Sequence, residues 1–121
     1  MQTREQINIV SDQVGTPTYE GDLAAALMKI GSEIQNDNFI PGIFHYSNEG
    51  VASWYDFAYE ISRLVNPGCL INPIETHEYP LPAPRPAYSV LNKNRIKEVY
   101  GVNIPHWKDS IQICYEKLIK Q

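Results

Sequence analysis

The stretch INIVSDQVGTPT, residues 7–18, is where the order of the structural elements can first be inferred. Residues 7–11 form a short apolar and β-branched run, which predicts a strand. The polar residues that follow include Gly15 and Pro17, which predict a turn. The chain is therefore expected to begin as a strand that leads into a loop.

A helix is expected directly after this loop and is predicted to end near Gln35. Its apolar residues recur at helical spacing: Leu23, Leu27, Ile30 and Ile34. Thr18 is expected to cap it, because its hydroxyl can accept a hydrogen bond from an unpaired N–H of the first turn. The loop before Thr18 thus joins a strand to a helix.

The same order repeats in the next part of the chain. Bulky β-formers in residues 42–47 predict a second strand. Residues 53–56, Ser-Trp-Tyr-Asp, match the Ser-x-x-acid pattern of a helix N-terminus. The helix has one apolar face, made by Trp54, Phe57, Ala58, Ile61, Leu64 and Val65. We expect Trp54 to pack in the core and residues 66–68, Asn-Pro-Gly, to end the helix.

The last part of the chain predicts one more strand and two more helices. A strand is expected at residues 69–74, and the four prolines in residues 79–86 predict an extended surface loop. A short helix is expected from about Asn92 to Tyr100, closed by Gly101. A longer helix is expected to begin at Pro105, with an apolar stripe of Trp107, Ile111, Cys114 and Leu118.

This order predicts an α/β fold, with a small incomplete parallel sheet of about three short strands and about four helices. With 121 residues, 43% of them hydrophobic and 20% charged, residues 1–121 are expected to form a single domain. The missing sheet edge suggests that further strands belong beside these.

Charge and composition exclude several classes of function. The net charge of −4 is spread along the chain without a basic block, which argues against nucleic-acid binding. No apolar run is long enough to span a membrane, and Met1–Gln6 has no signal-peptide core, so we expect a cytoplasmic protein. Cys69 and Cys114 lack the spacing of a zinc or redox motif and are expected to be buried free thiols.

Two segments carry residues suited to a polar or anionic ligand. The loop at residues 12–18 precedes a predicted helix N-terminus, where unpaired N–H groups favour anions, although a plain strand-to-helix turn explains it as well. Arg85 lies between two prolines and could bind a diphosphate or carboxylate through two parallel hydrogen bonds. Ser89 could add a hydroxyl contact, and the alternative is that both are ordinary surface residues.

Other residues that often carry chemistry lack the required neighbours. His45, His77 and His106 have no acidic or nucleophilic residue at a diagnostic spacing, so we assign them no catalytic or metal-binding role. The seven glycines do not form a dinucleotide-binding fingerprint. None of the eight tyrosines is followed four positions later by lysine, the pair that a short-chain reductase needs.

Taken in order, the motifs resemble the C-terminal part of the dTDP-4-dehydrorhamnose reductases, which belong to the extended short-chain dehydrogenase/reductase family. The matching residues are Val10-Ser11-Asp12-Gln13-x-Gly15-x-Pro17-Thr18, Asp22-Leu23-Ala24, Gly42-Ile43-Phe44-His45, Ser53-Trp54-Tyr55-Asp56-Phe57-Ala58, Arg85-Pro86-x-x-Ser89-x-Leu91, Tyr100-Gly101, Pro105 and Trp107. They extend over nearly the whole chain.

The resemblance implies reduction of dTDP-4-dehydro-L-rhamnose to dTDP-L-rhamnose with NADPH or NADH, in dTDP-rhamnose biosynthesis. It places the cofactor and all catalytic residues in an N-terminal Rossmann domain that this chain lacks, so the chain alone is expected to be inactive. The residues that it places near the dTDP-sugar are Gln13, Gly15, Pro17, Thr18, Arg85 and Ser89. Cofactor preference, homodimer formation and a magnesium ion in the intact enzyme stay open.

Two other interpretations remain at this point. One is a non-catalytic module related to the regulatory subunit of methionine adenosyltransferase, which shares the Asp-Gln-x-Gly-x-Pro-Thr stretch at residues 12–18. The other is a nucleotide-sugar epimerase or dehydratase relative, which the Arg-Pro-x-x-Ser segment at residues 85–89 makes less favoured.

Overall fold

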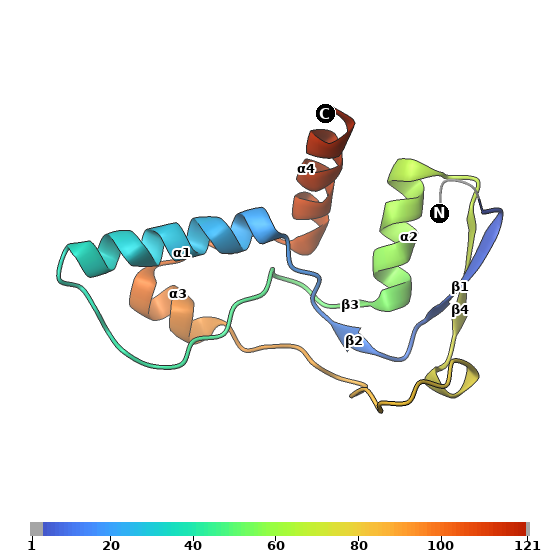
Figure 1. Ribbon diagram of the computed structural model, residues 1–121, viewed down its shortest axis with the longest axis horizontal. Coiled ribbons are helices and arrows are strands. Elements are labelled where there is room, and N and C mark those ends of the chain that lie inside the picture. Colours follow the sequence, from blue (N-terminus) through green and yellow to red (C-terminus); the bar gives the residue numbers. More distant parts are fainter. Residues whose placement is uncertain (1–3, 121) are drawn as a thin grey trace.

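The chain folds around two small hydrophobic cores that lie at opposite ends of an elongated molecule (Figure 1). The computed structural model describes residues 4–120; residues 1–3, part of the Met1–Gln6 stretch considered above, and Gln121 lie outside the described part. The elements in chain order are β1 (Gln6–Val10), β2 (Val14–Gly15), α1 (Glu20–Gln35), β3 (Ala52–Ser53), α2 (Trp54–Val65), β4 (Leu70–Ile74), the 3-10 helix η1 (Thr76–Glu78), α3 (Asn94–Tyr100) and α4 (Trp107–Ile119).

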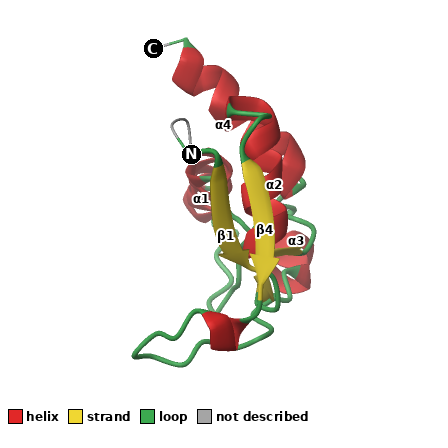
Figure 2. Ribbon diagram, turned by 90° about the vertical axis from the view of Figure 1, so that its right-hand side faces the viewer, coloured by secondary structure: helices red, strands yellow, loops and turns green. Residues whose placement is uncertain are grey.

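The first core lies between α2 and a two-stranded parallel sheet. Strands β1 and β4 pair in parallel, with Ile7 opposite Ile71, and lie side by side in Figure 2. Alternation along the strands turns Ile7 and Ile71 toward α2, where they pack with Ala58 and Cys69. The predicted first and third strands, their parallel pairing and the buried free thiol of Cys69 are therefore confirmed.

The second core joins α1 to α3 and to the segment that follows α3. Its buried residues are Ala26, Ile96, Tyr100, Val102 and Ile104. Gly101 ends α3 in the left-handed conformation, with φ of 59°, which a residue without a Cβ adopts at little cost. The predicted closure of this helix at Gly101 is confirmed.

The predicted strand at residues 42–47 was wrong, because this segment has no strand partner. Side chains of α3 bind the backbone here and just before it: Arg95 Nη1 donates to the Ile43 carbonyl at 3.1 Å, and Tyr100 Oη donates to the Ile40 carbonyl at 2.8 Å. Phe44 and Tyr46 pack against the second core. Among the described residues, the parallel sheet thus has two strands rather than about three, and β3 pairs antiparallel with β2.

The predicted cap of α1 was also wrong. The N-cap residue is Tyr19, and the hydroxyl of Thr18 donates to the Thr16 carbonyl at 3.4 Å instead of accepting from the helix. Asn48 takes over part of the capping role, because its Oδ1 accepts from the Tyr19 N–H at 3.0 Å. The predicted cap of α2 is confirmed: Ser53 and Asp56 form a reciprocal capping box.

Helix α4 closes the space between the two ends. Trp107 is buried, as predicted, and its ring meets that of Phe57 edge-on at 6.2 Å. Cys114 is a half-buried free thiol, whereas Leu118, at the end of the predicted stripe, is exposed. No helix among residues 4–120 is long and apolar enough to cross a membrane.

A buried carboxamide connects α1, α4 and the loop between them. Asn48 is fully buried; its Nδ2 donates to Asp22 Oδ2 at 2.6 Å and lies 2.7 Å from Ser110 Oγ. The Ser110 hydroxyl also donates to the Asp22 carboxylate. If Asn48 is lost, the Tyr19 N–H and the Pro105 carbonyl lose their bonds to it, and Ser110 and Asp22 each lose one of their bonds in a largely buried cluster.

We expect Asn48→Ala to lower the free energy of unfolding by about 3 kcal/mol, because it leaves several polar groups unsatisfied. Urea denaturation would measure the change. Asn38→Ala is the matched control: Asn38 is exposed and bonds only to Glu33 at 3.0 Å, so we expect a change below about 0.5 kcal/mol. Equal effects of the two substitutions would contradict a structural role for the Asn48 network.

Glu49 supplies a second, pH-dependent connection. Its carboxylate pairs with Lys97 and, at 3.5 Å, with Lys93, whose side chain is only 7% exposed. The hydrogen bond from Lys97, opposed by burial and aided by the charge of Lys93, holds the pKa of Glu49 below its ordinary value of 4.5. Because the pKa is depressed, the stabilisation is present above pH 4.5 and is lost as the pH falls through the folded-state pKa.

We therefore expect Glu49→Gln to destabilise the protein at pH 7 by about 2 kcal/mol, because the buried Lys93 loses a charged partner. The difference from wild type should shrink as the pH is lowered below 4.5. Urea midpoints across this pH range would show it. Glu98→Gln, an exposed change on the same helix as Lys97, should leave the pH dependence as in wild type.

Candidate functional site

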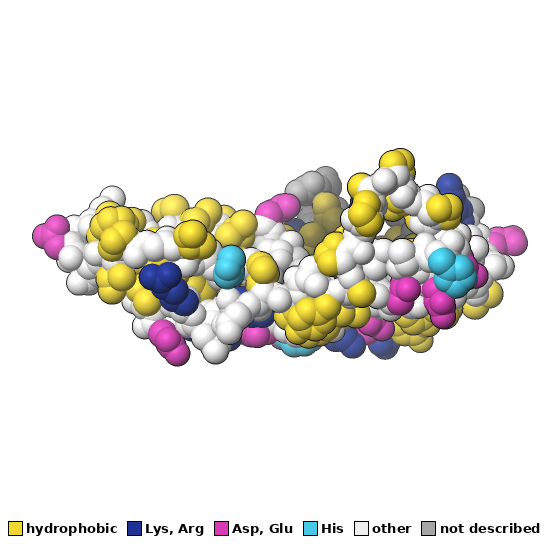
Figure 3. Space-filling view, turned by 90° about the horizontal axis from the view of Figure 1, so that it is seen from below, with side chains coloured by type: hydrophobic (Ala, Val, Ile, Leu, Met, Phe, Trp, Pro, Cys, Tyr) yellow, Lys and Arg dark blue, Asp and Glu magenta, His cyan; other side chains and the backbone are white. Residues whose placement is uncertain are grey.

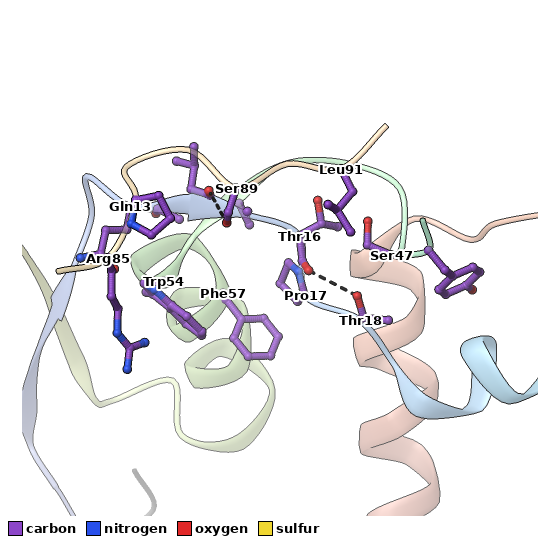
Figure 4. A pocket seen from close by; sticks show the side chains of 16 residues that line it. Gln13, Thr16, Pro17, Thr18, Ser47, Trp54, Phe57, Arg85, Ser89 and Leu91 are labelled. Atoms are coloured by element: carbon purple, nitrogen blue, oxygen red, sulfur yellow. Dashed lines mark hydrogen bonds between the residues drawn. The ribbon is translucent and has the colours of Figure 1, made fainter. Parts of the chain in front are cut away.

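A pocket of about 400 Å³ lies at the junction of the two ends (Figure 4). Four segments far apart in the sequence line it: residues 13–18, 46–47, 52–57 and 85–91. Their assembly depends on the short β2–β3 pairing and on the buried contacts of residues 47–49 described above. The pocket is therefore formed by the fold as a whole rather than by one loop.

All six residues singled out from the sequence line this pocket: Gln13, Gly15, Pro17, Thr18, Arg85 and Ser89. Backbone pairing explains how residues 85–89 reach residues 13–18. The Val14 N–H donates to the Ala87 carbonyl, and the Ser89 N–H donates to the Val14 carbonyl, both at 2.9 Å. A Cβ at position 15 would lie 2.8 Å from Ser89 Oγ, so a larger residue there would force the Ser89 hydroxyl to move.

Gln13 lies at the pocket but also holds the neighbouring turn in place. Its side chain is buried, and Nε2 donates to Thr76 Oγ1 at 3.1 Å. Asp12 accepts from the Thr76 hydroxyl at 2.7 Å and from the Thr76 N–H at 2.9 Å, and these bonds lower the pKa of Asp12. The 3-10 helix η1, which the sequence did not predict, is thereby attached to the loop after β1.

The start of α1 is less suited to an anion than the sequence suggested. Its first turn carries Glu20 and Asp22, whose charges oppose an anion at this end of the helix. The Tyr19 N–H is already bonded to Asn48, and Thr16 Oγ1 donates to the Gly50 carbonyl at 2.7 Å. Positive charge to bind an anionic ligand would therefore have to come from another residue of the pocket.

Arg85 is the source of that charge. It is the one charged residue lining the pocket, and its guanidinium makes no hydrogen bond or ion pair with any residue from 4 to 120. Its neighbours Pro84 and Pro86 restrict the backbone. An unpaired guanidinium in a pocket without carboxylates favours a phosphate or carboxylate ligand.

Sequence reasoning missed the aromatic part of the pocket. Trp54 was predicted to pack in the core, and this was wrong: its side chain is 52% exposed and lines the pocket. It is the first residue of α2, and the buried residues of this helix begin one turn later, at Ala58. Phe57, one turn further on, also lines the pocket while contacting Trp107. An apolar stripe alone does not distinguish a core position from a pocket wall.

Tyr46 contributes a further group that the sequence did not indicate. Its hydroxyl is buried and has no hydrogen-bond partner among the described residues, and Tyr46 lines the pocket. Burial, together with the charge of Asp22, raises the pKa of Tyr46, so the hydroxyl is a neutral donor near pH 7. Its neighbour Ser47 lines the pocket too but already donates to the Asn48 carbonyl at 3.2 Å.

The described residues contain no glycine-rich loop between a strand and a helix. Strand β1 runs into a turn and then β2, not into a glycine-rich loop that opens a helix, which is the arrangement that holds a cofactor pyrophosphate. His45 is exposed, and His106 caps α4, because its Nδ1 accepts from the Lys108 N–H at 3.2 Å. Residues 4–120 contain no group of three or more His, Cys, Asp or Glu side chains that could hold a metal ion.

Comparison with known proteins gives a family match and several relatives. Residues 1–120 match the family model for the RmlD substrate binding domain. The chain is 40% identical over 111 residues to the spore coat polysaccharide biosynthesis protein SpsK of Bacillus subtilis, covering 92% of this chain and 37% of that protein.

Two solved structures are also similar. A dTDP-4-dehydrorhamnose reductase from Clostridium acetobutylicum is 39% identical with a TM-score of 0.82, and the match covers 99% of this chain and 41% of that one. The Bacillus anthracis reductase, solved in complex with NADP, is 31% identical with a TM-score of 0.83, covering 94% and 39%. The chain thus spans about two fifths of the length of these relatives, and it belongs to the RmlD substrate-binding domain family.

Proposed function

We propose that this chain is the substrate-binding part of a dTDP-4-dehydrorhamnose reductase, which reduces dTDP-4-dehydro-L-rhamnose to dTDP-L-rhamnose with NADPH or NADH. The main observation behind this proposal is the unpaired guanidinium of Arg85 in a pocket that no carboxylate lines. The chain as a whole has a net charge of −4. Such a site attracts a dianionic diphosphate although the protein as a whole is acidic. The names of the similar reductases support the choice of sugar nucleotide.

Within this proposal, Arg85 binds the diphosphate, and the other five residues predicted from the sequence lie around the nucleotide-sugar. Ser89 offers a hydroxyl, while Gly15 and Pro17 shape the wall without filling it. Gln13 acts mainly through η1, because its amide nitrogen is already bonded to Thr76. None of these residues is proposed to transfer the hydride or the proton.

The hydride and proton donors are proposed to belong to an N-terminal Rossmann domain of the same protein. The NADP complex of the B. anthracis relative, which is more than twice as long as this chain, supports a cofactor in the remaining part. The sheet of β1 and β4 supports it too, because two parallel strands rarely stand alone and usually continue a larger sheet. The hydrophobic side chains exposed over the face seen in Figure 3 also support a further domain, because such a surface is typical of one that another part of a protein covers.

The alternatives considered from the sequence are less well supported. A regulatory module needs no pocket with an unpaired cation, and the similar solved structures are described as reductases rather than epimerases or dehydratases. The cytoplasmic location expected from the sequence stays a prediction, and so do a homodimer and a magnesium ion in the intact enzyme.

In the full-length protein we expect Arg85→Ala to raise KM for the dTDP-sugar about 10- to 100-fold with a smaller change in kcat, because it removes a charged contact to a part of the substrate that does not react. Steady-state kinetics would measure both values. Arg63→Ala is the control, since Arg63 lies on α2 outside the pocket and pairs only with Glu60. Unchanged kinetics in Arg85→Ala would remove Arg85 from the site.

We further expect the isolated chain to reduce no dTDP-4-dehydro-L-rhamnose when NADPH or NADH is added. Oxidation of the cofactor, followed by its absorbance, would test this expectation. Sustained turnover by the purified chain without other protein would contradict the proposal that the proton and hydride donors belong to an N-terminal domain.

A further inference from the structure

The indole of Trp54 is the one large aromatic surface of the pocket that the proposed contacts leave unused. Its side chain is 52% exposed, and it makes no ring stacking, cation–π contact or hydrogen bond with residues 4–120. The other tryptophan, Trp107, is only 3% exposed and contacts the rings of Phe57 and His106. A half-exposed tryptophan at a pocket wall is costly to hydrate and marks a binding surface.

The position of this indole is fixed by the start of α2. Ser53 Oγ accepts from the Asp56 N–H at 3.0 Å, and Asp56 Oδ2 accepts from the Ser53 N–H at 2.9 Å. Trp54 lies between these two residues, so its backbone is held by both bonds. The Ser53 backbone is further tied to β2 through its pairing with Val14. A ligand that stacks on the indole therefore has little backbone motion to restrict.

Arg85 shares this wall of the pocket. In Figure 4 the side chains of Trp54, Phe57 and Arg85 point to the same side, and all three line the cavity. A planar apolar surface near an unpaired cation matches the two ends of a nucleoside diphosphate, a flat base and a dianionic diphosphate. Ring stacking tolerates different bases, because every base has a π-face.

We infer that Trp54 is the stacking platform for the base of the nucleotide, while Arg85 holds its diphosphate. This inference rests on the proposed function and adds a specificity-determining residue to it. Trp54 contacts neither the reacting ketone nor the hydride donor, so its role is to bind the end of the substrate that stays unchanged. The sugar then extends away from this wall toward the rest of the protein.

Binding of three ligands to the full-length protein, measured by calorimetry, separates the contacts. We expect Trp54→Ala to weaken dTDP and the dTDP-sugar by the same factor, about tenfold or more, and to leave inorganic pyrophosphate unchanged. Arg85→Ala should weaken all three. Trp54→Phe should retain most of the affinity, whereas Trp54→Leu, which keeps bulk but has no aromatic face, should lose as much as alanine.

Tyr59→Ala is the matched control, because Tyr59 is a similarly exposed aromatic residue of α2, 47% exposed, that does not line the pocket. It should leave all three affinities unchanged. Wild-type affinity of Trp54→Ala or Trp54→Leu for dTDP would overturn the inference, and so would a loss confined to the dTDP-sugar, which would assign the indole to the sugar ring. Absence of dTDP binding by the wild-type protein would instead overturn the proposed function itself.

Discussion

The carboxamide of Asn48 lies where α1, α4 and the loop before β3 meet, and it bonds to four polar groups there. It bonds to the start of α1 through Tyr19, to the Asp22 carboxylate and to Ser110 of α4. The next residue, Glu49, exchanges backbone bonds with Pro105 and Trp107 and pairs with two lysines at α3. Asn48 and Glu49 therefore connect α1, α3 and α4 through directional polar bonds, which fix relative positions more strictly than apolar packing does.

Elements with local signals could be predicted from the sequence. Helix α2 has its own capping box at Ser53 and Asp56, and Gly101 closes α3 by its backbone freedom alone. Residues 42–47 carry the side chains of a strand, yet a strand exists only if another chain segment offers its backbone. Arg95 binds the backbone there instead, at Ile43, and Tyr100 binds it just before, at Ile40. Nothing near Thr18 shows that the distant Asn48 would bond the start of α1.

The candidate site divides in the same way. Arg85 between prolines and the Gly15–Thr18 loop could be chosen because their residue types suggest a ligand. Trp54 could not, because it continues the apolar face of its helix, and only the fold shows that this face leaves the core at its first turn. Tyr46, with its unpaired hydroxyl, belongs to the segment that was wrongly predicted as a strand. Its position at the pocket could therefore not be predicted either.

The pocket lies between two separate hydrophobic cores, and Tyr46 is the one residue of these cores that lines it among those the structure describes. The width of the pocket therefore depends on how the parts of the chain built around the two cores are oriented relative to each other. A substitution deep in either part that tilts it slightly would change ligand affinity without touching the ligand. The shape of the pocket therefore depends on residues far from its lining, and both cores can stay intact while that shape changes.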